Sequence, residues 1–413
     1  MKQYIITERT DLFDVSMMIV MRAEIKGSAS KETIRSAFDR AVGAHEILSS
    51  KTVLIGDGKA YYEKSAPAQS ITFTDEEQDE IIAREERTRF RTEQCEFLRA
   101  HCIKHTAEGF TMLFCMHHLG GDGKSLIYFI ETFMQALDEQ ELDFRVMRRA
   151  ETDSLPPESK LSFVNSMFVR YFNKHWQKER RVFGFDELDK AFSGFWSTRS
   201  TRVQEKLFDS ETTKKILADC KKGGVRLTSY ITAVMIKNMG GKRSVGYAVD
   251  GRTDGNRSMG NQATGISVDA GYDGRKSLVE NAAGIQFQMK EKLDDPRKKW
   301  LMLRFYGELD GTLSDAVNML AAGAFSSKAV SAAAEALGYG KKVKDLSITN
   351  LTRLDIPTVY GGFSIEGVSF IPPVVSYAKN VVGIVTANDC MRVTLHTFSD
   401  NTLTLDELLE GLV

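Results

Sequence analysis

The run CMHHLGGDGKS, at residues 115–125, holds the densest group of reactive side chains in the sequence. Within it, residues 117–123 bring together two imidazoles, one carboxylate and three glycines. The apolar residues 111–115 precede this run, and apolar residues at helical spacing follow it from Leu126 to Phe133. A histidine at such a strand-to-helix corner can reach a cleft, while glycines leave room for a substrate or for a bulky cofactor arm. The pattern therefore predicts a strand, a corner that carries the chemistry, and a helix.

The composition is that of a soluble globular protein, with 42% apolar and 27% charged residues. A chain of 413 residues exceeds one compact core, so we expect two domains of roughly 150 to 200 residues. The formal net charge of -1 supplies no global field that would attract nucleic acid or an anionic membrane.

The five cysteines are scattered and form no CxxC pair, which favours a reducing compartment and argues against disulfides and structural zinc. The first residues contain no apolar core of signal-peptide length. No later run approaches the ~20 apolar residues that span a bilayer. We therefore expect a cytoplasmic protein without a membrane span.

Residues 1–150 alternate between strand-like and helix-like patterns and predict an α/β lobe. A helix is expected over residues 31–44, capped by Ser30, and another from the histidine run to about Leu137. The expected strands of this lobe cover residues 17–25, 52–55, 60–63, 97–103 and 111–116.

Residues 151–202 are expected to connect this lobe with a second one. Their aromatic and basic segment, residues 168–176, is compatible with a helix that binds a membrane surface or nucleic acid. We favour the simpler interpretation, a helix that packs its aromatic rings on the body and keeps its lysines in water.

Residues 203–413 predict a second α/β lobe, whose similar texture is consistent with a structural duplication. One expected helix is the alanine-rich segment 315–337. The other expected helices cover residues 211–220, 227–239 and 277–293, and the expected strands cover 244–249, 265–269, 346–349, 363–370, 381–386 and 391–398.

The histidine pair alone leaves several roles open. Zinc would need further ligands, but the other histidines (His45, His101, His105, His175, His396) form no set with suitable spacing. A catalytic triad is not indicated either, because no GxSxG run occurs and Cys115 falls in an expected buried strand. A general base acting alone remains, on a hydroxyl or amine that attacks an electrophile which is already activated.

HHxxxDG between a strand and a helix resembles the signature of the chloramphenicol-acetyltransferase-like superfamily. That superfamily includes condensation domains of nonribosomal peptide synthetases, plant-type acyltransferases, polyketide-associated acyltransferases and alcohol O-acetyltransferases. Three more segments are similar to segments of these families, in the same order along the chain: FLRA at residues 97–100, VDGR with MGN at 249–252 and 259–261, and TNLTRLDIP at 349–357.

The resemblance implies two chloramphenicol-acetyltransferase-like α/β lobes, residues 1–150 and 203–413, that form a pseudo-dimer around a central tunnel. His118 would be the general base that removes a proton from the acceptor as it attacks a thioester. No metal and no permanently bound cofactor is expected. The co-substrate would be an acyl-CoA or a phosphopantetheine thioester, and the acceptor a small alcohol or amine.

Other site residues follow from the same resemblance. The backbone N–H of Gly123 and the side chains of Asn350 and Asn261 are candidate contacts to the oxyanion or the substrate. Asp122 is expected to pair with Arg252 and to hold the histidine loop in shape, although it could instead cap the following helix.

His117 is expected to be a packed, hydrogen-bonded neighbour of the base. The chain also departs from the family patterns. It carries Ser49 where condensation domains often have an arginine, Thr352 where a glycine is usual, and no DFGWG motif.

Three functions therefore stay open. The leading one is a free-standing, monomeric acyltransferase that uses acyl-CoA. The second is a stand-alone condensation enzyme with substrates tethered to an acyl carrier protein, for which the basic residues Arg170, Lys174, Lys178, Arg180 and Arg181 could line a tunnel mouth. The third is a degenerate relative that binds a ligand or partner without catalysis.

Overall fold

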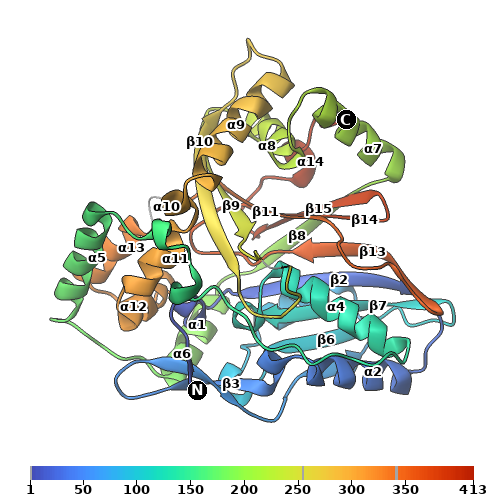
Figure 1. The fold of residues 1–413 in the computed structure, drawn as a ribbon, viewed down its shortest axis with the longest axis horizontal. Helices are drawn as coiled ribbons and strands as arrows, with labels where there is room; N and C mark the ends of the chain where they lie inside the picture. The colour runs from blue at the N-terminus through green and yellow to red at the C-terminus, as the bar shows by residue number, and fades with distance from the viewer. Residues whose placement is uncertain (1, 254, 340–342) are drawn as a thin grey trace.

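A computed structural model describes residues 2–253, 255–339 and 343–413 (Figure 1). Two six-stranded mixed sheets dominate it, and helices cover their outer faces. The first sheet has the order β12 (Val359–Tyr360), β13 (Phe363–Ile371), β2 (Met18–Lys26), β7 (Gly109–His117), β6 (Leu98–Ile103) and β5 (Ser70–Phe73). The second has the order β10 (Ala263–Gly271), β9 (Lys242–Asp250), β11 (Leu346–Arg353), β14 (Val381–Ala387), β15 (Cys390–Phe398) and β8 (Thr201–Phe208). A small third sheet joins β1 (Gln3–Tyr4), β4 (Ala60–Lys64) and β3 (Ser50–Leu54).

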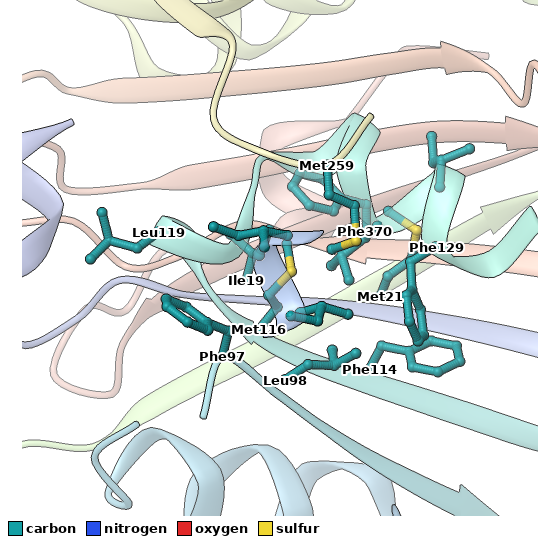
Figure 2. Close-up of a cluster of buried hydrophobic side chains, with 14 of the residues drawn as sticks. Ile19, Met21, Phe97, Leu98, Phe114, Met116, Leu119, Phe129, Met259 and Phe370 are labelled. Carbon is teal, nitrogen blue, oxygen red and sulfur yellow. The ribbon is translucent and has the colours of Figure 1, made fainter. Parts of the chain in front are cut away.

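Helices α2 (Lys31–Gly43) and α4 (Gly123–Leu137) cover one face of the first sheet. The buried rings of Phe38, Phe114 and Phe129 meet edge to face between these helices and the sheet. Figure 2 shows that Met259 and Phe370, from the second half of the sequence, join the same cluster of buried side chains. The core under the histidine run is thus built from both halves of the chain.

The second sheet is covered by α7 (Ser210–Lys222), α8 (Leu227–Met239), α9 (Leu278–Leu293) and α14 (Leu405–Leu408). Helix α8 is buried along most of its length, because nearly every residue from Ser229 to Ile236 is covered. Its side chains form a separate core with β9, β11, β14 and β15.

Strand β13 connects the two halves. It lies late in the sequence, yet it pairs antiparallel with β2 of the first sheet, from Ser364 opposite Lys26 to Ile371 opposite Val20. The next strand, β14, returns to the second sheet and pairs with β11 and β15. Each sheet therefore contains paired strands that are distant in the sequence, and no local sequence pattern specifies their pairing. The lobe boundaries at residues 150 and 203 stay a prediction.

Eight further α-helices lie among the described residues. They are α1 (Arg9–Leu12), α3 (Gln78–Glu86), α5 (Phe163–Trp176), α6 (Phe185–Trp196), α10 (Pro296–Lys299), α11 (Leu301–Glu308), α12 (Gly311–Ala321) and α13 (Lys328–Ala336). Helices α5, α11, α12 and α13 lie together at one side of the molecule (Figure 1).

The predicted mixed α/β class is confirmed, and most predicted elements are present with ends shifted by a few residues. The single helix expected over residues 315–337 is wrong. The chain turns at Gly323, which has φ +78°, and this turn lets Phe325 pack its ring against Trp176 and Phe183. Two shorter helices, α12 and α13, result.

The interpretation of residues 168–176 is only half right. Val169, Phe172 and Trp176 of α5 pack on the body as expected. However, Phe168 and Tyr171 are exposed to solvent, by 39% and 55%.

Candidate functional site

The histidine run lies at a strand-to-helix corner. Strand β7 ends at His117, a 3-10 turn covers His118–Gly120, and α4 begins at Gly123. Gly121 makes the corner possible: its φ is +145°, and a Cβ there would lie 2.4 Å from Cβ of Ser125. The turn therefore requires a glycine at position 121.

His118 is held by its backbone and by one amide. Its N–H donates to the Met17 carbonyl at 2.8 Å, which fixes the turn against the start of β2. Its Nδ1 lies 3.1 Å from Nδ2 of Asn261. The side chain keeps 20% of its surface exposed, so solvent or a substrate can reach the ring.

The tautomer of His118 decides what its two ring nitrogens can do. With a proton on Nδ1, the ring cannot accept from the Asn261 amide, and Nε2 is free to act as a base. Without that proton, Nδ1 accepts from the Asn261 amide, whose orientation is set because its Oδ1 accepts the N–H of Ala263 at 3.1 Å. Only the first tautomer can take a proton at Nε2.

Burial lowers the pKa of His118 below its ordinary value, although the negative charges of Asp122, Glu8 and Asp14 oppose the shift. The ring is therefore neutral at neutral pH, which is the form that a general base needs.

Three more buried carboxylates, those of Glu8, Asp11 and Asp14, lie near enough to influence the ring, and they were missed from the sequence. Asp11 of α1 lies 3.8 Å from Nδ1 of His118 and accepts a hydrogen bond from Nδ2 of Asn261 at 3.0 Å. Burial and the neighbouring carboxylates Glu8 and Asp14 raise the pKa of Asp11 well above its usual range. Glu8 itself is paired with Arg149 at 2.8 Å. Helix α1 has only four residues, so no periodic pattern could have revealed this group.

Asp122 has both of the roles considered from the sequence, as a cap of α4 and as the partner of Arg252. Its carboxylate caps α4 by accepting the N–H of Ser125 at 2.9 Å, and it accepts the N–H of Gln262 at 3.0 Å. It also forms a two-pronged ion pair with Arg252. This pairing holds the pKa of Asp122 below its usual value despite burial, which acts in the opposite direction.

His117 faces away from His118. Its Nδ1 accepts the N–H of Leu119 at 3.2 Å, and its ring meets Phe90 edge to face. Burial lowers the pKa of His117 to about 3, so the ring is neutral and its proton sits on Nε2. A cavity of about 30 Å³ lies beside it, between Asp14, Phe90 and Trp196.

The structure places the two remaining candidates differently. Gly123 is the first residue of α4, and its N–H belongs to the first turn, whose N–H groups have no partner within the helix. Asn350 lies on β11, where its amide donates to Thr228 at 2.9 Å and its oxygen accepts the N–H of Thr352. Asn350 thus supports the second sheet, whereas Gly123 and Asn261 lie at the histidine corner.

The described residues offer few groups for metal or thiol chemistry. Among the described residues, no three histidine, cysteine or acidic side chains lie close enough to hold a metal ion. Cys115 is fully covered within β7, and burial raises the pKa of its thiol well above the ordinary value. The accessible imidazole of His118, next to a helix N-terminus, is the arrangement best suited to proton transfer.

The sequence matches no protein-family model, and no curated protein compared with it is similar. Solved structures are nevertheless similar in fold. The first condensation domain of the CDA synthetase superposes with a TM-score of 0.65 at 12% identity, over 99% of this chain and 93% of that one. TRI3 trichothecene 15-O-acetyltransferase from Fusarium sporotrichioides gives a TM-score of 0.69 at 11% identity, over 98% and 93%.

Polyketide synthase associated protein 5 from Mycobacterium tuberculosis gives a TM-score of 0.61 at 14% identity, over 100% of this chain and 95% of that one. At identities this low, the similarity shows the fold alone, and the chemistry has to be argued from the site. The chain therefore has the two-lobed fold that these condensation-domain and acetyltransferase structures share.

Proposed function

We propose that the protein is an acyltransferase that moves an acyl group from a thioester to a small alcohol or amine, with His118 as the general base. The observation that carries this proposal is the neutral, solvent-reached imidazole of His118 at the N-terminal end of α4. A thioester needs no metal, because the thiolate is a competent leaving group. The protein then has to position the reactants, remove one proton and stabilise an oxyanion.

The reaction follows in two steps. Nε2 of His118 accepts the proton of the acceptor's hydroxyl or amine while the oxygen or nitrogen attacks the thioester carbonyl. The carbonyl becomes a tetrahedral oxyanion, which the N–H of Gly123 at the positive end of α4 can stabilise. The oxyanion then collapses, the C–S bond breaks, and the thiolate takes up the proton from the His118 imidazolium. The products are the acylated acceptor and a free thiol.

The donor is proposed to be acyl-CoA, with a carrier-bound acyl-phosphopantetheine as the alternative. Both present the same arm and thioester, so His118 would treat them alike. Thiol release followed with a colorimetric thiol reagent, across a panel of alcohols and amines, tests the proposal.

We expect thiol release that depends on an acceptor. A well-placed base contributes ~10²–10⁴-fold in rate, so His118→Ala should lose about this much. His105→Ala is the matched control, since His105 lies away from the corner and bonds to the Ala29 carbonyl. Release with acylated carrier protein alone would select the carrier-dependent alternative. Silence of the wild-type chain with both donors would reject catalysis and favour the degenerate binding protein.

A further inference from the structure

Helix α5 leaves a continuous apolar face uncovered. Phe163, Val164, Met167, Phe168 and Tyr171 are exposed by 76%, 72%, 53%, 39% and 55%. Their spacing of one and four residues places them on a single side of the helix. Of the fourteen large hydrophobic side chains that are exposed among the described residues, five therefore lie within nine residues of one helix. Exposed apolar side chains are normally scattered, and a concentrated patch marks a contact surface.

The opposite side of α5 already anchors the helix to the protein. Val169, Phe172 and Trp176 are buried, and the Trp176 indole donates to Thr312 at 2.8 Å. The exposed face is thus not needed to hold α5 in place. A helix that is apolar on two opposite sides is expected to be covered on both.

Positive charge accompanies the uncovered face. Lys160, Arg170, Lys174 and Lys178 are exposed, and none of them forms an ion pair with any described residue. Between residues 160 and 179 the only acidic residue is Glu179. The whole chain has a formal net charge of -1, so this positive charge is local to the region of α5 and cannot be seen in the net charge.

The position and the charge of this face limit what can cover it. Figure 1 shows α5 at the outer edge of the molecule, beside α11, α12 and α13. Apolar side chains accompanied by positive charge match an anionic bilayer, in which a negative headgroup layer covers apolar acyl chains. A second copy would bring the same unpaired lysines and arginine close to one another, which like-charge repulsion opposes.

We propose that α5 docks the protein on an anionic lipid bilayer. The rings of Phe163 and Tyr171, with Met167, enter the boundary between headgroups and acyl chains, while Lys174, Lys178 and Arg170 contact anionic headgroups. Docking of this kind is peripheral: in the described part of the chain no helix has the length and apolar character to cross a membrane. The proposal concerns where the protein works and does not depend on the acyl transfer proposed above.

Vesicle flotation with the full chain tests the docking. We expect the protein to float with vesicles of phosphatidylcholine and phosphatidylglycerol, to float less with phosphatidylcholine alone, and to be released by salt. The double substitution Phe163→Ser with Tyr171→Ser should abolish flotation. Lys174→Glu with Lys178→Glu should weaken it on the order of tenfold or more. The control pair Phe287→Ser with Val359→Ser removes apolar side chains exposed by 65% and 66% elsewhere and should leave flotation unchanged.

A fluorescent variant reports directly whether position 163 enters the bilayer and keeps a large apolar side chain there. Phe163→Trp should shift its emission to the blue and be quenched by brominated acyl chains when anionic vesicles are added. The matched variant Phe287→Trp should not respond. No flotation of the wild-type chain, or emission from the Phe163→Trp variant that stays unquenched, would overturn the proposal. So would a dimer in solution that the Phe163→Ser and Tyr171→Ser pair dissociates, since a second copy would then cover this face.

Discussion

Arg252 reaches Asp122 across 130 residues of sequence with two hydrogen bonds, of 2.9 Å from Nη1 to Oδ2 and 3.0 Å from Nη2 to Oδ1. Only 4% of the arginine side chain and 7% of the carboxylate side chain are exposed. Arg252 follows β9 of the second sheet, while Asp122 begins α4 on the first. The pair therefore ties the two sheets together at the corner that carries His118.

We expect Arg252→Met to lower the free energy of unfolding by about 3–5 kcal/mol, because it leaves a buried carboxylate without its charge partner. Acyl transfer should fall as well, since the loop between β7 and α4 loses its support. Urea unfolding followed by circular dichroism measures the first effect. Arg275→Met is the control: Arg275 pairs with Asp273 but its side chain is 91% exposed, so no measurable loss is expected. Similar curves for the two variants would show that the buried pair does not stabilise the corner.

The local part of this corner was predictable, and the long-range part was not. The glycines and the apolar spacing after Asp122 are sufficient to predict a helix to about Leu137, and α4 ends there. Nothing in the spacing of residues connects Asp122 with Arg252. That pair was expected only from the resemblance to known families, which supplies long-range information that a single sequence lacks.

Other features depend on pairing between distant strands. Asn350 stays a candidate for a contact to the substrate, and the register of β11 beside β14 and β9 places its amide against Thr228 of α8. The pairing of β13 with β2 is equally invisible to periodicity, because alternation predicts a strand and not its partner. Asp11, next to His118, belongs to a helix too short to leave a pattern.

Close packing at Gly123 leads to the second prediction. A Cβ at this position would lie 2.8 Å from Cδ2 of Leu351 and 3.1 Å from the ring of Phe370. Gly123→Ala should therefore push the start of α4 away from the second half of the chain, at a cost of about 1–3 kcal/mol in the free energy of unfolding. Gly284→Ala is the control, because a Cβ there has open space within α9, and alanine favours a helix by ~0.5–1 kcal/mol over glycine. Thermal unfolding of both variants should shift in opposite directions, and a stable Gly123→Ala variant would contradict the packing argument.

Asn261 gives a prediction about the pH dependence of the proposed reaction. Its amide can donate to Nδ1 of His118 only in the neutral tautomer that carries its proton on Nε2, which is not the tautomer that acts as the base. The bond therefore holds the pKa of the ring down, in the same direction as burial, and it lowers the share of neutral ring in the basic tautomer. In Asn261→Ala the midpoint of the acidic limb of the kcat/KM profile should move to higher pH. Loss of a net hydrogen bond of ~0.5–1.5 kcal/mol should raise the plateau above that limb by up to about two- to tenfold.

Asn350→Ala is the matched control for this profile, since its amide bonds to Thr228 and not to the imidazole. The acidic limb of the Asn350→Ala profile should stay at the same pH as in the wild type, even if the rate of this variant changes. A uniform loss of rate in Asn261→Ala, without movement of the limb, would mean that Asn261 acts through packing alone.

The last prediction concerns His396, which joins the two sheets at a second buried point. Its Nδ1 donates to the Pro372 carbonyl at 2.7 Å, and its Nε2 lies 3.0 Å from the Glu86 carboxylate of α3. Burial opposes protonation of this ring, but the charge and hydrogen bonding of Glu86, with the Pro372 carbonyl, outweigh burial and raise its pKa. A neutral ring with its proton on Nδ1 would turn the Nε2 lone pair toward the carboxylate.

A raised pKa in the folded chain means that His396 contributes stability in full below the unfolded value of about 6.5, and that this contribution is lost as the pH rises through the folded value. We expect the wild-type chain to lose unfolding free energy as the pH rises from about 6.5 through the raised pKa of the folded chain. His396→Gln should be less stable at the acidic end of this range, because Glu86 loses its partner, and should lose less on going to the alkaline end. Denaturant unfolding at several pH values measures this difference, and His105→Gln should retain the wild-type dependence. Parallel stability curves for wild type and His396→Gln would show that the histidine is neutral when folded and that the pair with Glu86 carries no charge.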